Sequence, residues 1–178
     1  FYLGQDARYL QDYAKALAGL AVRTDAVNET TYWSYSAYSS QVEEAELHRT
    51  WLAGEPTVAP SPVTQAYTNF LLASVFVDDY VVGAAAVLPC YWLYAQTGAQ
   101  ITRISDEHPY AAWLHTYHDD EFAQATAQAL AIVERAFALA APQARSRAAR
   151  AYLTACRHEM EFFDQALRVD LDDPGCDE

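Results

Sequence analysis

The pattern of apolar and polar positions predicts an all-helical protein. Apolar residues recur at steps of three and four along almost the whole sequence, and no stretch keeps the strict alternation of a strand. We find no internal repeat or low-complexity tract, so a compact bundle is favoured over a solenoid. We therefore expect one helical domain spanning residues 1–178, with a frayed tail at about 171–178.

Glycine, proline and capping residues divide the chain into its predicted helices. Ser61 followed by Pro62 is typical of a helix start, and Pro142 is expected to break the chain between the last two elements. The first helix is predicted over residues 2–22, and the second begins at a cap, Asp25 or Asn28, and ends at Gly54. A third helix is predicted from residue 62 to near Asp78, followed by an uncharged helix from residue 80 to near Gly98. One or two helices are predicted over 111–139, and a last helix over 143–169.

Two carboxylates interrupt apolar stripes. Asp6 stands in the stripe Leu3, Asp6, Leu10, Tyr13, Leu17 of the first helix, with Tyr9 beside it, and Glu159 stands in the stripe Tyr152, Cys156, Glu159, Phe163, Ala166 of the last. A buried carboxylate needs a cation, several hydrogen-bond donors or a proton. Each could be structural, Asp6 bonded to tyrosine hydroxyls and Glu159 to an arginine, or each could be functional.

A proline lies directly before a cysteine inside the uncharged helix. Pro89 removes a backbone hydrogen bond and presses against the carbonyl of Ala85, so we expect a kink that turns the Cys90 thiol toward a cavity. Tyr94 lies one turn further along the same face. The alternative is an inert thiol packed in the core. Two stripe carboxylates, this thiol and several tyrosines together favour a small polar pocket.

Composition and charge narrow the function classes. The 178 residues carry 11 basic against 24 acidic side chains, a net charge of −13, which disfavours nucleic acid and anionic lipid as partners. The longest uncharged run, residues 80–102, is interrupted by Gly, Pro and Gln and falls short of a membrane span. Three cysteines without paired short spacing favour a reducing cytoplasm.

Five segments of the chain resemble the successive motifs of one known family. Residues 5–10 (QDARYL), 46–48 (ELH), 66–71 (AYTNFL), 88–94 (LPCYWLY) and 159–163 (EMEFF) are similar, in order and rough spacing, to the motifs of the TenA or thiaminase II family, in its cysteine-containing branch. The Leu-Pro-Cys motif is the most specific of these. Phe163 departs from the family pattern, which has tryptophan there.

The resemblance implies a fold, an activity and a set of roles. The fold would be a heme-oxygenase-like helical bundle, commonly a homotetramer; the family has a further helix before the Gln-Asp motif, which this sequence would lack. The activity would be hydrolysis of thiamin, or of its aminopyrimidine breakdown product, to hydroxymethylpyrimidine for thiamin salvage, without a cofactor. The residues alone do not choose between the two substrates. Cys90 would be the nucleophile and Glu159 the acid/base, while substrate would be bound by Asp6, Tyr9, Tyr13, Tyr67, Tyr94, Tyr117 and Phe162.

Two alternatives to this enzyme remain open. The first is a metal-binding bundle, because His115, His118 and Glu121 fall at three-residue steps, although a solvated helix face explains the same spacing. The second is a non-catalytic pyrimidine-binding or interaction protein of the same fold. Because an ionised Glu159 would discourage thiolate formation at Cys90, the enzyme hypothesis requires Glu159 to be protonated when Cys90 attacks.

Overall fold

The chain folds into a bundle of helices. The computed structural model describes residues 1–50, 58–101, 107, 111 and 120–169, and these contain six helices and no strand. The helices are α1 (Tyr2–Ala21), α2 (Val27–Thr50), α3 (Pro62–Phe76), α4 (Tyr80–Gln100), α6 (Asp120–Leu139) and α7 (Pro142–Val169).

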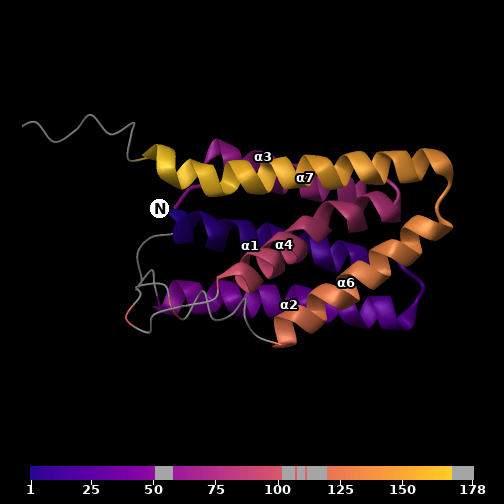
Figure 1. Cartoon of the computed structure of the whole chain (residues 1–178), viewed down its shortest axis with the longest axis horizontal. Coiled ribbons are helices and arrows are strands. Elements are labelled where there is room, and N and C mark those ends of the chain that lie inside the picture. The colour runs from indigo at the N-terminus through magenta and orange to yellow at the C-terminus, as the bar shows by residue number, and fades with distance from the viewer. Residues whose placement is uncertain (51–57, 102–106, 108–110, 112–119, 170–178) are drawn as a thin grey trace, which may run out of the picture.

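Helices α1 and α4 occupy the centre of the bundle. In Figure 1 they run between α3 and α7 on one side and α2 and α6 on the other. The contacts agree with this view, since α1 packs on α2 and α3, whereas α4 packs on α7, α6 and α3. Residues 81–89 of α4 are all buried, as expected for a helix without charged side chains. The central helices therefore carry side chains that face every other layer.

Helices α3 and α4 approach each other closely at a glycine. A Cβ atom added to Gly83 would lie 2.9 Å from the Cα of Val75 and 3.1 Å from the carbonyl oxygen of Ser74. Both atoms belong to the backbone of α3 and cannot turn away. Gly83 is thus required by the packing distance between the two helices.

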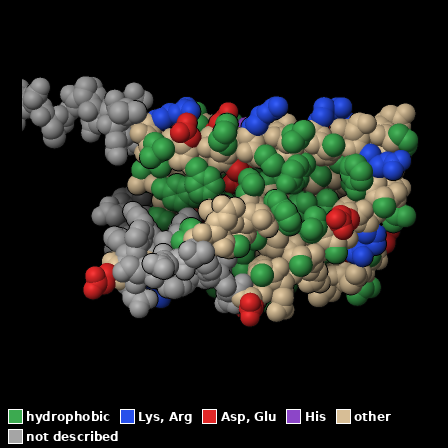
Figure 2. Space-filling view, in the orientation of Figure 1, with side chains coloured by type: hydrophobic (Ala, Val, Ile, Leu, Met, Phe, Trp, Pro, Cys, Tyr) green, Lys and Arg blue, Asp and Glu red, His purple; other side chains and the backbone are tan. Residues whose placement is uncertain are grey.

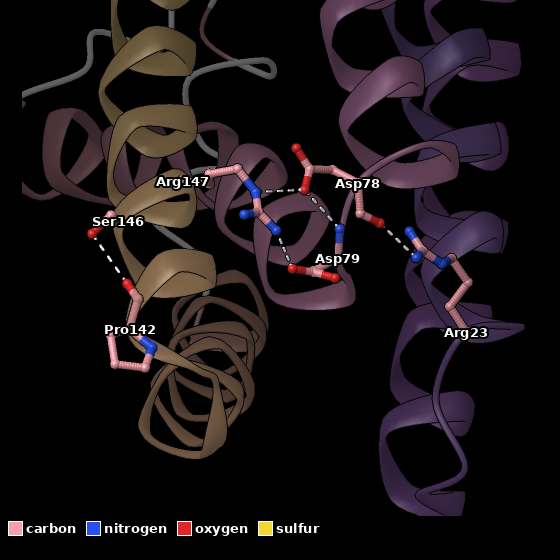
Figure 3. Close-up of polar contacts among 6 residues, drawn as sticks. All are labelled: Arg23, Asp78, Asp79, Pro142, Ser146 and Arg147. Atoms are coloured by element: carbon pink, nitrogen blue, oxygen red, sulfur yellow. Dashed lines mark hydrogen bonds and ion pairs between the residues drawn. The ribbon is translucent and has the colours of Figure 1, made fainter.

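Two arginines hold the turn between α3 and α4 (Figure 3). The guanidinium of Arg23, just after α1, donates to the carbonyl oxygens of Val75 and Asp78. Arg147 of α7 pairs with Asp78 at 3.0 Å and with Asp79. The Arg23 bonds satisfy the carbonyl of Val75, which the last turn of α3 leaves without a helical partner, and that of Asp78 just beyond the helix. The turn is therefore fixed from both the first and the last helix.

A buried carboxylate on α2 is fully accounted for by structural bonds. Glu29, 6% exposed, accepts hydrogen bonds from the hydroxyls of Tyr80 at 2.8 Å and Thr24 at 3.0 Å, and it pairs with Arg135 at 3.1 Å. The indole N–H of Trp33 donates to the Tyr80 hydroxyl. This cluster ties α2, α4 and α6 together.

Most predicted element boundaries are confirmed. Ser61 caps α3 by accepting from the N–H of Thr64, and Pro62 opens that helix. The predicted caps of the second helix are wrong, because α2 begins at Val27, so that Asp25 lies before its first turn and Asn28 within it. Residues 51–57, 112–119 and the predicted tail lie outside the described residues.

The buried stripe of α7 lies one position away from the predicted one. Phe163 is 39% exposed, and Tyr152 and Cys156 are only half-buried. The prediction followed the large side chains, whereas the tight contact with α4 selects alanines. Glu159 belongs to both stripes. The buried residues are Ala144, Ala148, Ala151, Ala155, Glu159, Phe162 and Gln165.

Candidate active site

A pocket of about 420 Å³ opens between α2 and α6 and reaches the central helices. Its floor is buried and rich in hydroxyl groups, whereas its mouth is exposed and polar. Such a volume is in the range of small-molecule sites. The lining residues are Asp6, Tyr9, Leu10 and Tyr13 of α1; Tyr32, Tyr35, Ser36, Ser39, Ser40 and Glu43 of α2; Cys90, Tyr91 and Tyr94 of α4; and Glu121, Phe122, Gln124, Ala125 and Gln128 of α6.

Cys90 lines this pocket from the centre of α4. Its thiol is half-buried, and Pro89 precedes it inside the helix, as the sequence predicts. Burial, followed by the nearby Glu159, raises the pKa of the Cys90 thiol well above its usual range. The resting residue is therefore a thiol that needs a base or a bound cation to ionise.

Glu159 lies behind the pocket wall, on α7. It is 2% exposed, and its Oε1 accepts a hydrogen bond of 2.7 Å from the hydroxyl of Tyr67. Burial raises its pKa to about 8, opposed by the Tyr67 hydrogen bond and reinforced by the negative charge of Asp6. At neutral pH the carboxyl group is mostly protonated, in agreement with the requirement stated from the sequence.

Tyr9 supplies an unsatisfied hydroxyl at the pocket floor. The residue is 3% exposed, it lines the pocket, and its hydroxyl oxygen has no hydrogen-bond partner within the described part of the chain. Its ring packs between those of Tyr13, at 5.3 Å, and Tyr67, at 5.0 Å. The Tyr9 hydroxyl also acts on the Cys90 thiol, whose pKa it lowers against the larger effect of burial.

The structure brings most of the predicted site residues to one place. Asp6, Tyr9, Tyr13, Cys90 and Tyr94 line the pocket. Asp6 is 5% exposed and close enough for its charge to act on both Cys90 and Glu159. Carboxylates from the first and last helices therefore converge on the thiol.

Two predicted substrate contacts lie one layer further back. Tyr67 and Phe162 do not line the pocket; they pack behind Tyr9, with ring centroids 5.0 and 5.5 Å from its ring. Tyr9 occupies the wall position and covers both of them. Their direct contact with substrate stays a prediction; in the structure, the Tyr67 hydroxyl donates to Glu159. Tyr117 lies outside the described residues.

The prediction missed the wall that α2 contributes. Its lining positions 32, 35, 36, 39, 40 and 43 follow the three- and four-residue steps of one helix face. Because this face carries Tyr, Ser and Glu, it does not stand out as an apolar stripe. A search for a hydroxyl-rich stripe at helical spacing could have found it. Glu121 of α6, first considered as a metal ligand or a solvated residue, also lines the pocket.

The metal-binding alternative finds no support in the described residues, whereas the non-catalytic alternative is not tested by the structure. Within residues 1–50, 58–101 and 120–169, no group of three His, Cys, Asp or Glu side chains could hold a metal ion, although His115 and His118 lie outside this part. A helix long and apolar enough to span a membrane does not occur there either. The cytoplasmic location and the homotetramer stay predictions.

The described chain is an all-helical bundle with a half-buried thiol and a buried carboxyl group beside a pocket. The model of the TENA/THI-4/PQQC family matches residues 1–169, and the chain belongs to this family. Its fold is the all-α heme-oxygenase-like bundle, as in a TenA homologue from Pyrococcus horikoshii (TM-score 0.81, 23% identity, 94% of this chain and 81% of that chain) and one from Pyrococcus furiosus (TM-score 0.84, 15% identity, 92% and 80%).

Two relatives have names that state an enzymatic or biosynthetic function. The chain is 49% identical to the thiamine biosynthesis multifunctional protein ThiED of Corynebacterium glutamicum, over 94% of this chain and 22% of that protein. It is 27% identical to the aminopyrimidine aminohydrolase of Bacillus subtilis, over 94% of this chain and 75% of that protein. The chain thus spans about a fifth of the length of the multifunctional relatives.

Proposed function

We propose that this chain is an aminopyrimidine hydrolase of thiamin salvage, releasing hydroxymethylpyrimidine from aminomethylpyrimidine or thiamin. The observation that carries the proposal is the position of the Cys90 thiol in a pocket wall, near the buried carboxyl group of Glu159, whose pKa burial raises to about 8. A soft nucleophile and a protonated acid are the pair that addition to an aminopyrimidine ring needs.

In the first half of the reaction, the sulfur of Cys90 bonds to a ring carbon while Glu159 gives its proton to a ring nitrogen. With aminomethylpyrimidine as the substrate, the thiol proton passes to the departing amine; with thiamin, the thiazolium leaves as the neutral thiazole and the thiol proton passes to solvent. The bond between the methylene carbon and the amine then breaks, and the electron pair leaves with the amine. Protonation of the ring withdraws electrons from the attacked carbon, which is why an acid of raised pKa promotes the step.

In the second half, water adds to the exposed methylene carbon and gives a proton to the Glu159 carboxylate. The carbon–sulfur bond then breaks, the ring proton returns to the sulfur, and aromaticity is restored. The balance is one water consumed and one amine released. Tyr67 would keep Glu159 in place through its 2.7 Å hydrogen bond, and Phe162 would support Tyr9 from behind.

Asp6 and the tyrosines would hold the pyrimidine. Asp6 at the pocket floor would offer a carboxylate to the amino edge of the ring, and Tyr13 and Tyr94 would provide aromatic faces in the same wall. The hydroxyl of Tyr13 donates to the carbonyl of Val87, and that of Tyr94 bonds the hydroxyl of Tyr2, so both rings are held in place. Tyr117 is proposed as a further contact on the strength of the family resemblance.

The proposal is tested by removing one thiol at a time. We expect Cys90→Ala, and similarly Glu159→Gln, to lower the rate of aminopyrimidine hydrolysis by about 100-fold or more. Cys156→Ala is the matched control, because Cys156 is the other free cysteine of the described residues, is similarly half-buried, and does not line the pocket. Product formation is followed by chromatography, and circular dichroism verifies folding.

Hydrolysis by Cys90→Ala within a few-fold of the unsubstituted protein would overturn the nucleophile assignment. If the unsubstituted protein binds the pyrimidine and releases no product, the chain is the non-catalytic binding protein that was left open above. Equal losses in Cys90→Ala and Cys156→Ala would likewise count against a specific role for Cys90.

A further inference from the structure

His158 is an ionisable residue of α7 that packs inward rather than facing solvent. Its side chain is 18% exposed, whereas Arg157 beside it and Glu161 one turn further on are exposed. On the face of the molecule shown in Figure 2, α7 presents Lys and Arg side chains along its outer edge. His158 instead contacts α3, so its role is to be found in that contact.

The imidazole of His158 stacks on the ring of Tyr67. The two ring centroids are 5.1 Å apart, and the ring planes are inclined by only 17°. Phe70, one turn further along α3, contacts the same imidazole with a centroid distance of 5.2 Å. From α1, the ring of Tyr9 packs on Tyr67 at 5.0 Å. The orientation of the Tyr67 ring is therefore set by aromatic side chains from both the first and the last helix.

His158 contributes a ring to this contact rather than a hydrogen bond from its Nδ1. This nitrogen is buried and has no hydrogen-bond partner in the described part of the chain. The carboxylate of Glu161 lies 3.6 Å from Nδ1, which is beyond hydrogen-bond distance, and that side chain is 50% exposed. An ion pair of this kind contributes little. The stack on Tyr67 is thus the stronger of the two contacts.

The position of the Tyr67 ring determines the direction of its hydroxyl group. That hydroxyl donates to Glu159 at 2.7 Å, and both residues are almost fully buried. His158 and Glu159 are neighbours on α7, so their side chains leave the helix about 100° apart. One of them contacts the face of Tyr67, and the other accepts from its hydroxyl. Two successive residues of α7 therefore hold the same tyrosine at two points.

Tyr67 acts on Glu159 differently from the other titratable groups around it. Its hydrogen bond is the one that the described residues make to the Glu159 carboxyl group, and it lowers the pKa of Glu159 against the larger effect of burial. Asp6 acts by charge and raises that pKa. A residue that moves Tyr67 thus changes the hydrogen bond and leaves the charges in place. The other titratable groups close enough to interact with Glu159 by charge are Tyr2, Tyr9, Cys90 and Cys156.

We propose that His158 is a positioning residue for the acid of the reaction: its imidazole fixes the Tyr67 ring, and the Tyr67 hydroxyl in turn fixes the Glu159 carboxyl group. His158 is not among the residues that line the pocket, so it acts through Tyr67. The inference rests on the proposed function for the role of Glu159 as the acid. A carboxyl group that is free to turn spends less time aimed at the ring nitrogen, and proton transfer is then slower.

The experiment compares His158→Ala with His158→Phe, which keeps an aromatic face on Tyr67. We expect His158→Ala to lower kcat for aminopyrimidine hydrolysis about three- to tenfold, the scale of one weakened hydrogen bond, and to leave KM nearly unchanged. Because the weakened bond lets the pKa of Glu159 rise further, the fall in rate at high pH should begin at a higher pH. His158→Phe should restore both the rate and the pH profile.

Glu161→Gln is the matched control, because it removes the charge beside His158 and leaves the stack intact. We expect it to behave as the unsubstituted protein. A loss in Glu161→Gln equal to that in His158→Ala would overturn the proposal, since the effect would then come from charge. Equal kcat values for His158→Ala and His158→Phe would also overturn it. If His158→Ala does not fold, His158→Leu replaces it in every comparison, because leucine fills a similar volume without a ring.

A double-mutant cycle with Tyr67→Phe separates positioning from packing. Tyr67→Phe removes the hydroxyl and keeps the ring on which His158 stacks. In the Tyr67→Phe background, we expect His158→Ala to cause no further loss of kcat and no further shift of the pH profile. The loss of stability toward urea should persist in both backgrounds, because it reports packing. Equal losses of kcat in the two backgrounds would refute an action through the hydroxyl.

Failure of this inference can be distinguished from failure of the proposed function. If the unsubstituted protein hydrolyses the pyrimidine and His158→Ala has the same kcat and pH profile, the positioning role is overturned and the proposed function stands. If no pyrimidine is hydrolysed, the proposed function fails, and the positioning role is read from urea unfolding. The stability difference between His158→Ala and His158→Ala/Glu159→Gln should then continue to change up to a higher pH than in the unsubstituted background. The same pH dependence in both backgrounds would overturn the positioning role.

Discussion

Replacing Glu159 by glutamine removes an ionisable group from the interior and keeps its shape and its hydrogen bond with Tyr67. The pKa of Glu159 is raised from 4.5 to about 8 by burial. Between these two values the folded protein retains a proton that the unfolded chain releases. Rising pH therefore favours unfolding, and the stability contribution of the protonated carboxyl group, complete below pH 4.5, is lost as pH rises toward 8.

The size of the effect follows from the proton balance. One retained proton changes the free energy of unfolding by about 1.4 kcal/mol for each pH unit. The full window from 4.5 to 8 gives an upper limit of about 5 kcal/mol, and above it the loss is constant. Because other carboxyl groups also titrate, the informative quantity is the difference between the unsubstituted protein and Glu159→Gln.

Urea unfolding followed by circular dichroism at several pH values between about 5 and 8 measures this difference. We expect Glu159→Gln to gain stability over the unsubstituted protein steadily as pH rises, by several kcal/mol across the range. Glu134→Gln, which changes an exposed glutamate of α6, should show a flat difference. Parallel curves for Glu159→Gln and the unsubstituted protein would refute the raised pKa and, with it, the role of Glu159 as a protonated acid.

Two further substitutions test the packing around the site. Gly83→Ala should lower the free energy of unfolding by about 1–3 kcal/mol, because its Cβ would lie 2.9 Å from the Cα of Val75; an unchanged thermal midpoint would show that α3 and α4 are further apart. Tyr80→Phe removes a donor to the buried Glu29 and the acceptor of the Trp33 indole N–H, so urea unfolding should show a loss of about 1–3 kcal/mol, and a stability equal to the unsubstituted protein would contradict the cluster.

Helix identity and order could be predicted from the sequence because breakers and caps act locally. Ser61 and Pro62 set the start of α3 through their own backbone geometry, as predicted. The register of the buried face of α7 could not be predicted in the same way. This register depends on the distance between α4 and α7, which is set by tertiary packing. The close approach of the two helices favours burial of Ala148, Ala151 and Ala155 over their larger neighbours.

The site was predictable where its chemistry conflicts with its surroundings. Asp6 and Glu159 interrupt apolar stripes, and Pro89 lies inside a predicted helix, so each of them can be recognised from the sequence alone. The pocket wall formed by α2 could not be predicted, because Ser36 and Glu43 are ordinary residues of a polar helix in the sequence. Only the packing of α6 against the pocket makes them lining residues. The sequence also could not predict that Tyr67 lies behind Tyr9, because the position of the Tyr9 ring decides which of the two rings faces the cavity.

The convergence of the first and last helices sets the moment at which the site comes into existence during folding. Glu159 reaches Tyr67 across 92 residues, and Asp6 acts on it from the opposite end of the chain. A nascent chain that has not yet released α7 from the ribosome therefore cannot bring Glu159 to Tyr67 and Cys90. The arrangement proposed for catalysis would thus form only when α7 packs onto the other helices, because its contacts join residues far apart in the sequence.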